Sequence, residues 1–220
     1  MKKTIGILFF LLFAGILKAQ QANFQPEWTF GGSAGATFSK IRFTQNVPQD
    51  MLLQATGGLA VRYISEKHFG LQLELNYSQR GWKETVDTVM HVNEYSRRID
   101  YLELPLMTHI YFNMGKRARL IFNLGPQIGF QIGEKELSRK INTPDGLYSG
   151  IYDQKIQRKF DYGIAGGGGV ELRTGIGSFV LEGRYYFGLS DIFNNTRSDY
   201  FQSSGNQLTT IKLTYFLVAR

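Results

Sequence analysis

The chain has 220 residues, a formal net charge of +7 and no cysteine. A chain of this length is enough for one all-β barrel or sandwich, or for two small domains. The absence of cysteine excludes disulfides, cysteine-ligated metal sites, a cysteine nucleophile and a lipid-modified amino-terminal cysteine. No run of Lys or Arg is longer than two residues, so nucleic acid is not an expected partner.

Residues 1–19 have the pattern of a secretory signal peptide: two lysines, an apolar run over residues 5–17 and a small residue, Ala19. We predict cleavage before Gln20, which leaves one mature domain, residues 20–220, and removes three lysines. The apolar run is shorter than the roughly 20 residues that a bilayer-spanning helix needs. An amino-terminal anchor or a buried helix is the alternative.

Apolar and polar side chains then alternate in eight segments, at residues 28–38, 53–63, 69–82, 99–112, 120–132, 160–172, 179–189 and 208–220. Since a strand points successive side chains to opposite faces, each segment predicts a strand with one apolar and one polar face. In the third strand the apolar face is Phe69, Leu71, Leu73, Leu75 and Tyr77. Together the segments predict an all-β fold: an eight-stranded antiparallel up-and-down transmembrane β-barrel.

The expected connections alternate in length. Those at residues 65–68, 113–117 and 173–177 are short, whereas those at residues 39–52, 81–98, 133–159 and 190–207 are long and polar. Outer-membrane barrels have short periplasmic turns and longer loops outside the cell. Aromatic residues near both ends of the apolar faces match the aromatic girdles of such barrels. The pattern therefore favours export to the outer membrane.

The strand pattern alone leaves open a soluble lipocalin-type barrel or sandwich, whose apolar face would be the core. The polar face, however, is rich in glycine, and small residues suit the narrow lumen of an eight-stranded barrel. Enclosed charges must be paired, and this face has three acids and three bases. We predict that they form a charge network in the lumen, made of Arg62, Glu74, Glu103, Glu182, Arg184 and Lys212. Within it, Arg62 is the expected partner of Glu74, and Lys212 is the expected partner of Glu182.

Several segments resemble the PorT-type outer-membrane β-barrel family of Bacteroidota: LKAQ, LQLELNYSQRGW, YLELPLMTHIYF, GPQIGF, DYGIAGGGGVEL and FVLEGRYYFGLSDI. The resemblance covers the whole mature chain, and YLELP and the glycine-rich strand are its more specific parts. It implies an eight-stranded outer-membrane barrel. The protein that gives the family its name is associated with type IX protein secretion, while most members have no assigned role.

No catalytic, cofactor or metal site is expected. GIAGGGGVEL lacks the GK[ST] ending of a phosphate-binding loop and continues the strand alternation. The three histidines, His68, His91 and His109, do not have metal-ligand spacing, and no His–carboxylate cluster forms at the outer rim. Residues 87–89 match a short O-glycosylation pattern of Bacteroidota.

These features predict a non-enzymatic interaction or scaffold subunit of the cell envelope, with outer-membrane lipid and subunits of a secretion or assembly complex as its partners. Loops on rigid scaffolds commonly carry function, and Tyr and Arg are enriched in protein contacts. The candidate contact residues are therefore Tyr148, Tyr152 and Arg158. A narrow channel, an outer-membrane enzyme and a soluble binding barrel are the alternatives.

Overall fold

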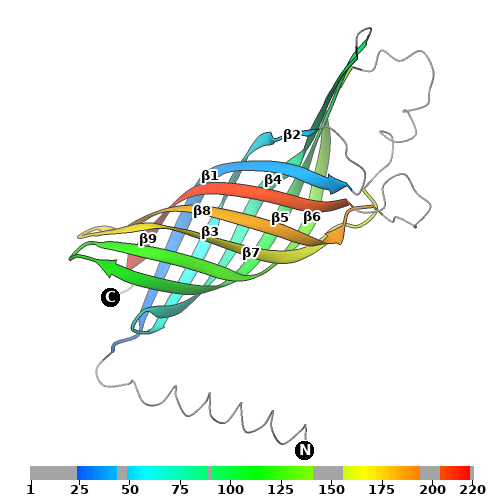
Figure 1. Ribbon diagram of the computed structural model, residues 1–220. Helices are drawn as coiled ribbons and strands as arrows, with labels where there is room; N and C mark the ends of the chain where they lie inside the picture. Colours follow the sequence, from blue (N-terminus) through cyan, green and yellow to red (C-terminus); the bar gives the residue numbers. More distant parts are fainter. Residues whose placement is uncertain (1–23, 44–48, 89–90, 141–155, 194–203, 219–220) are drawn as a thin grey trace, which may run out of the picture.

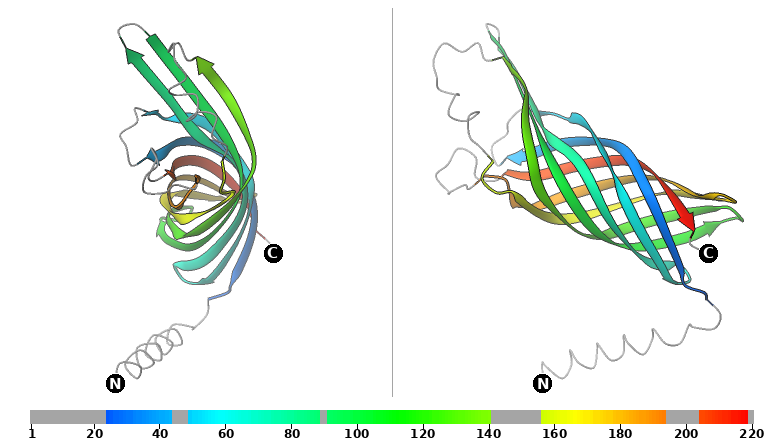
Figure 2. Two further views of the ribbon diagram at one scale, coloured as in Figure 1. Left: turned by 90° about the vertical axis from the view of Figure 1, so that its right-hand side faces the viewer. Right: turned by 180° about the vertical axis from the view of Figure 1, so that it is seen from behind.

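The computed structural model describes residues 24–43, 49–88, 91–140, 156–193 and 204–218, so the predicted signal peptide, residues 1–19, lies outside the described residues. Eight long strands form a closed antiparallel ring in chain order, with β1 paired to β9 and β4 paired to β5 (Figures 1 and 2). They are β1 (Glu27–Phe43), β3 (Leu52–Glu66), β4 (Phe69–Thr88), β5 (His91–Met114), β6 (Ala118–Lys140), β7 (Phe160–Thr174), β8 (Gly177–Asp191) and β9 (Ser204–Val218). The two-residue strand β2 (Gln49–Asp50) pairs with β4 outside this ring.

The two faces of each strand are separated as the alternation predicts. On β4, Leu71, Leu73 and Leu75 are 46, 44 and 45% exposed, whereas Gln72 and Glu74 are 1 and 2% exposed. The apolar side chains therefore form the outer surface, which suits contact with lipid, and the polar side chains fill the lumen. The predicted eight-stranded up-and-down barrel is confirmed, and the soluble barrel with an apolar core is wrong.

Aromatic side chains gather at the ends of the outer apolar surface. At the short-turn end the rings of Trp28 and Tyr63 lie 4.5 Å apart, and those of Phe179 and Tyr215 lie 4.9 Å apart. At the other end Phe160 is exposed beside Tyr162. Such rings mark the two interfaces of a membrane. Among the described residues no helix is long and apolar enough to cross a bilayer.

Two segments predicted as loops are strands instead. β4 continues to Thr88, β5 begins at His91 and β6 runs on to Lys140, whereas pairing between β6 and β7 ends at Phe130 opposite Phe160. Residues 81–88, 91–100 and 131–140 therefore form a three-stranded sheet beyond the barrel mouth, here called the projecting sheet (Figures 1 and 2). The prediction was wrong because these residues lack the regular apolar–polar alternation of the barrel wall: Trp82, Tyr95 and Ile99 are buried at the mouth among polar and charged neighbours.

Leu106 offers a test of the lipid-facing surface, since it lies on β5 between the two aromatic ends and is 48% exposed. Leu106→Arg should lower the free energy of unfolding by about 2–4 kcal/mol, the cost of Arg on the lipid face near the bilayer midplane. Equilibrium unfolding in phospholipid vesicles measures this loss. The matched control is Leu137→Arg on the projecting sheet, which should change stability by less than about 0.5 kcal/mol; equal losses would contradict the assignment.

Candidate functional site

The centre of the lumen is organised around the carboxylate of Glu74 on β4. Arg184 from β8 donates to both of its oxygens, at 3.0 and 2.9 Å, and Lys212 from β9 donates to Oε2 at 2.7 Å. The amides of Gln72 and Asn76 donate to the same carboxylate, at 2.5 and 2.9 Å. Two cations thus share one buried acid, and the bidentate arginine fixes its orientation.

A second acid completes this central cluster. Glu182 lies two residues before Arg184 on β8, so the two side chains share the inward face. Arg184 donates to Glu182 at 3.0 Å, Lys212 lies 3.8 Å from it, and Asn123 donates to it at 2.8 Å. Lys212 stands opposite Glu182 in the ladder, the register expected from the sequence. The central cluster therefore contains two acids and two bases, with no excess charge.

The predicted pair of Glu74 and Arg62 is wrong. In the ladder between β3 and β4, Glu74 stands opposite Ala60, and Arg62 stands opposite Gln72. Arg62 donates to Gln72 at 2.8 Å and to Glu171 at 3.3 Å. Its nearest acid therefore comes from β7, not from the adjacent strand. In a lumen this narrow, long side chains reach across to strands that are distant in the chain.

A separate outer cluster holds Glu103, together with two residues that were not among the predicted network. Arg80 is 1% exposed, and its guanidinium lies 2.6 Å from both Glu103 and Asp161. The rings of Tyr101 and Tyr186 lie 4.7 and 4.6 Å from the guanidinium carbon. Both missed residues stand on the polar faces of their strands, and that alternation is the signal that could have identified them.

The inner end of the lumen, near the short turns, has a third ionic contact. Glu171 accepts from Arg62, and its Oε2 lies 4.0 Å from Nη1 of Arg119. His109, fully buried, has its Nδ1 2.8 Å from Oδ1 of Asn123. At these three levels the described residues include five acids and five bases: Glu74, Glu103, Asp161, Glu171 and Glu182, and Arg62, Arg80, Arg119, Arg184 and Lys212.

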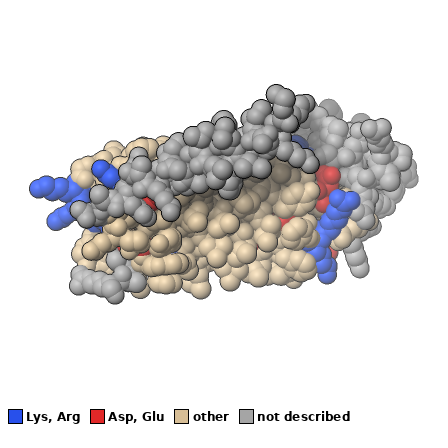
Figure 3. All heavy atoms as spheres, turned by 90° about the horizontal axis from the view of Figure 1, so that it is seen from below, with Lys and Arg blue, Asp and Glu red and all other residues tan. Residues whose placement is uncertain are grey.

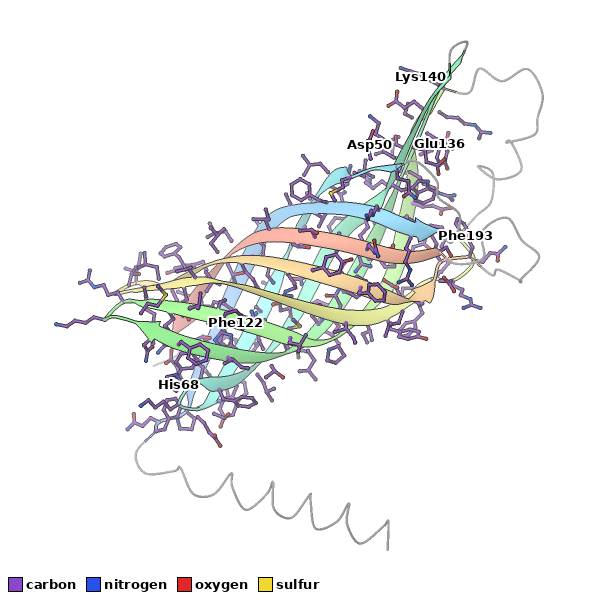
Figure 4. The ribbon with its side chains drawn as sticks, in the orientation of Figure 1. Asp50, His68, Phe122, Glu136, Lys140 and Phe193 are labelled. Atoms are coloured by element: carbon purple, nitrogen blue, oxygen red, sulfur yellow. The ribbon has the colours of Figure 1, made fainter. Side chains whose placement is uncertain are left out.

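Apolar clusters close the lumen above and below the charges. The outer cluster is Ile41, Trp82, Tyr95, Ile99, Tyr101, Ile156, Ile192 and Phe193, and the inner one is Ala60, Ile64, Tyr111, Ile121, Val180 and Phe216. Phe193 lies at the barrel mouth (Figure 4). Between the central and outer charges a cavity of about 20 Å³ remains, roughly the room for one water molecule.

Over residues 18–194 the sequence matches the family described as outer membrane protein β-barrel domain. The chain belongs to this family. The protein is accordingly an outer-membrane protein, which agrees with the exposed apolar side chains on the outside of its barrel. Among curated proteins none matches the sequence.

Solved structures of other outer-membrane barrels are similar to this chain, and the likeness to OprG supports the same fold. OprG from Pseudomonas aeruginosa is 14% identical with a TM-score of 0.50, and the alignment covers 91% of this chain and 99% of that one. Ail, the attachment invasion locus protein of Yersinia pestis, is 14% identical with a TM-score of 0.41, over 87 and 99% of the two chains. The outer membrane enzyme PagL is 13% identical with a TM-score of 0.40, over 86 and 98%. Likeness at this level describes the fold alone.

The structure describes only some of the remaining residues singled out in the sequence. Tyr148 and Tyr152 lie outside the described residues, and Arg158 is exposed at the mouth, where its N–H donates to the carbonyl of Ile192 at 3.2 Å. His68 occupies the turn between β3 and β4 at the opposite end (Figure 4). In the described part of the chain no three His, Asp or Glu side chains gather as metal ligands. GIAGGGGVEL lies within β7 and forms no loop.

Two inward-facing glycines of β7 lie close to the backbone of β8, beside the central cluster. Gly167 stands opposite Arg184, and Gly169 stands opposite Glu182. A Cβ added to Gly167 would lie 2.7 Å from the Cα of Arg184, and one added to Gly169 would lie 2.8 Å from the Cα of Glu182. These distances are shorter than van der Waals contact. Glycine at these two positions therefore permits the backbones of β7 and β8 to lie close together beside the central cluster.

Gly167→Val should lower the free energy of unfolding by about 1–3 kcal/mol, because the added side chain overpacks the lumen. The matched control is Gly183→Val on the adjacent strand: it faces outward, with nothing within 4 Å of an added Cβ. Urea unfolding in detergent micelles compares the two. A loss at Gly183 as large as that at Gly167 would show that β-branching itself, and not lumen crowding, causes the effect.

Proposed function

We propose that this outer-membrane barrel is a non-conducting, non-catalytic interaction subunit of the cell envelope, which binds a protein partner through its projecting sheet. The observation that carries the proposal is the contrast between the filled lumen and the projecting sheet. The lumen is filled at every level by paired charges and apolar clusters, while three strands continue past the mouth. A filled lumen supports a scaffold more than a transporter.

The projecting sheet has the properties of a contact surface. Its three strands continue strands of the barrel wall and pair with one another, with register shifts between β5 and β6 at Ser96/Arg97 and Asp100/Tyr101. Ion pairs brace it from strand to strand: Arg97 lies 2.7 Å from Glu134, and Lys140 lies 3.8 Å from Glu94. Leu137 is 42% exposed among these charges. Figure 4 shows Glu136 and Lys140 on this sheet, far from the short-turn end.

The resemblance to PorT-type barrels supports a place in a secretion or envelope-assembly complex, and we extend the proposal to such a complex. The candidate contact residues predicted from the sequence, Tyr148, Tyr152 and Arg158, would add to the same contact. Many proteins with a rigid scaffold carry recognition on such connections.

Photo-crosslinking in native membranes tests the proposal. A photoreactive amino acid at position 137 should yield a discrete crosslinked protein, whereas the same group at position 106, on the lipid-facing surface, should yield none. A panel of crosslinker positions on both faces of residues 131–140 that captures no protein would overturn the proposal.

The rival function is a narrow channel, and planar-bilayer recordings distinguish it. The filled lumen should give no resolvable single-channel steps for the purified protein, because paired charges and apolar clusters occupy it and the cavity between the central and outer charges is about 20 Å³. Steps on the nanosiemens scale would contradict a non-conducting barrel.

A further inference from the structure

A basic cavity lies at the short-turn end of the barrel, between the β5–β6 turn and the end of β7. Its volume is about 300 Å³, and its lining is Asn113, Gly115, Lys116, Arg117, Ala118, Arg119 and Arg173. Four of these residues are cations and none is an acid. Figure 3 shows Lys and Arg side chains protruding at the left-hand end of the molecule, the end of the short turns. The cavity therefore presents a concave positive surface.

Two of the four cations have no acidic partner. Arg173 donates to both carboxylate oxygens of Glu27, at 2.9 and 3.1 Å, and its charge is compensated. Lys116 and Arg117 are exposed, and neither forms an ion pair within the described residues. The cavity thus keeps two uncompensated positive charges.

Arg119 adds an unused hydrogen-bond donor. Its Nε donates to Asn113 at 3.1 Å, and its guanidinium carbon lies 4.3 Å from the ring centre of Tyr111. Its Nη1 is buried and, in the part of the chain that the structure describes, has no hydrogen-bond partner. The nearest acid, Glu171, is 4.0 Å from that nitrogen, beyond hydrogen-bonding distance. A buried donor without an acceptor is costly, and an anion in the cavity would satisfy it.

The position of the cavity beside the outer apolar surface indicates where that anion comes from. Phe112, Met114 and Leu172 are 49, 57 and 48% exposed, and they belong to the outer apolar surface immediately beside the cationic lining. The cations therefore stand at the edge of the apolar band, on the side of the short turns. In outer-membrane barrels this end faces the periplasm. Phospholipid phosphates occupy that level of the membrane, and basic pockets there suit anionic headgroups.

We propose that this cavity binds the phosphate of an anionic phospholipid from the periplasmic leaflet. Lys116 and Arg117 supply the uncompensated charge, and Arg119 supplies the buried donor. Charge-assisted bonds from Arg to phosphate are among the stronger hydrogen bonds in proteins. The acyl chains would then lie along Phe112, Met114 and Leu172. This site is at the opposite end from the projecting sheet and does not depend on the proposed function.

Binding of short-chain lipids to the full mature chain in non-ionic detergent tests the proposal. Dihexanoyl phosphatidylglycerol should bind, whereas dihexanoyl phosphatidylcholine and inorganic phosphate should bind much more weakly, as measured by isothermal titration calorimetry. The double variant Lys116→Gln/Arg117→Gln should weaken phosphatidylglycerol binding about ten-fold or more, since each basic residue adds to the attraction of an anionic lipid.

The matched control is Lys40→Gln/Lys159→Gln, which removes the same charge from exposed residues near the other end of the barrel. It should bind phosphatidylglycerol as the parent protein does. Equal binding by the two double variants, or equal binding of phosphatidylcholine, would overturn the proposal. Inorganic phosphate bound as tightly as phosphatidylglycerol would overturn the lipid assignment and indicate a site for a free anion. The shift of the folded band on unheated gels shows that each variant is folded.

Discussion

Replacing Glu74 with glutamine should lower the free energy of unfolding by about 3–5 kcal/mol, the usual cost of removing one partner from a buried ion pair. The side chain keeps its size, so packing is not the cause. The change leaves Arg184 and Lys212, which are 6 and 4% exposed, with Glu182 as their only nearby acid. An excess positive charge then lies in the lumen. Urea unfolding in phospholipid vesicles measures the loss.

A compensating variant separates charge from contact in this cluster. Glu74→Gln/Lys212→Met removes one acid and one base, which leaves Arg184 paired with Glu182 at 3.0 Å. It should be more stable than Glu74→Gln alone, although it has lost more hydrogen bonds. The surface control is Glu136→Gln on the projecting sheet, whose ion pair with Arg139 is 3.8 Å long and largely exposed. Such pairs contribute about 0–1 kcal/mol. A loss for Glu74→Gln no larger than that of the control would contradict the paired-lumen account.

Arg80→Met should lower the free energy of unfolding by roughly 3–5 kcal/mol, because it leaves two buried carboxylates without a cation between them. Glu103 and Asp161 are 5 and 1% exposed, and Arg80 lies 2.6 Å from both. The same change also removes the guanidinium from between Tyr101 and Tyr186. The fraction of protein that keeps its folded mobility on gels after graded heating reports the loss.

Two further variants sharpen this prediction. Arg80→Lys retains the charge but cannot donate to two carboxylates from a planar group, so it should fall between the parent protein and Arg80→Met. Arg98→Met is the control, since Arg98 pairs with Asp100 on the same strand at 3.0 Å and is 25% exposed. It should cost less than about 1 kcal/mol. If Arg80→Met and Arg98→Met lost their folded gel mobility at the same temperature, the outer cluster would have no special role in stability.

Much of the fold is predictable from the sequence, because each strand has a single requirement: apolar toward lipid and polar toward the lumen. That requirement repeats every second residue, so the faces of Leu73 and Glu74 follow from the chain alone. The closure of the barrel then follows from eight such strands with alternating short and long connections. The order of strands around the ring and the burial of the polar faces agree with this prediction.

The partners within the lumen could not be predicted in the same way. Glu74 meets Arg184, which is 110 residues away and four strands further along the chain. Which inward side chains meet depends on the diameter and tilt of the barrel, and no local pattern encodes these. The projecting sheet was missed for a different reason. Since residues 133–140 are mostly polar and charged and do not alternate, they look like a loop, although they continue β6.

The orientation of the strands is the central claim, and β4 allows it to be measured directly. Because the chain has no cysteine, spin labels can be attached at single sites in lipid vesicles: Leu71→Cys, Gln72→Cys, Leu73→Cys, Leu75→Cys and Asn76→Cys. Accessibility to oxygen, which concentrates in the bilayer, should be high at positions 71, 73 and 75. It should be low at positions 72 and 76, where the labels lie in the filled lumen. High oxygen accessibility at 72 and 76, or accessibility of 71, 73 and 75 to a water-soluble nickel reagent, would contradict the account.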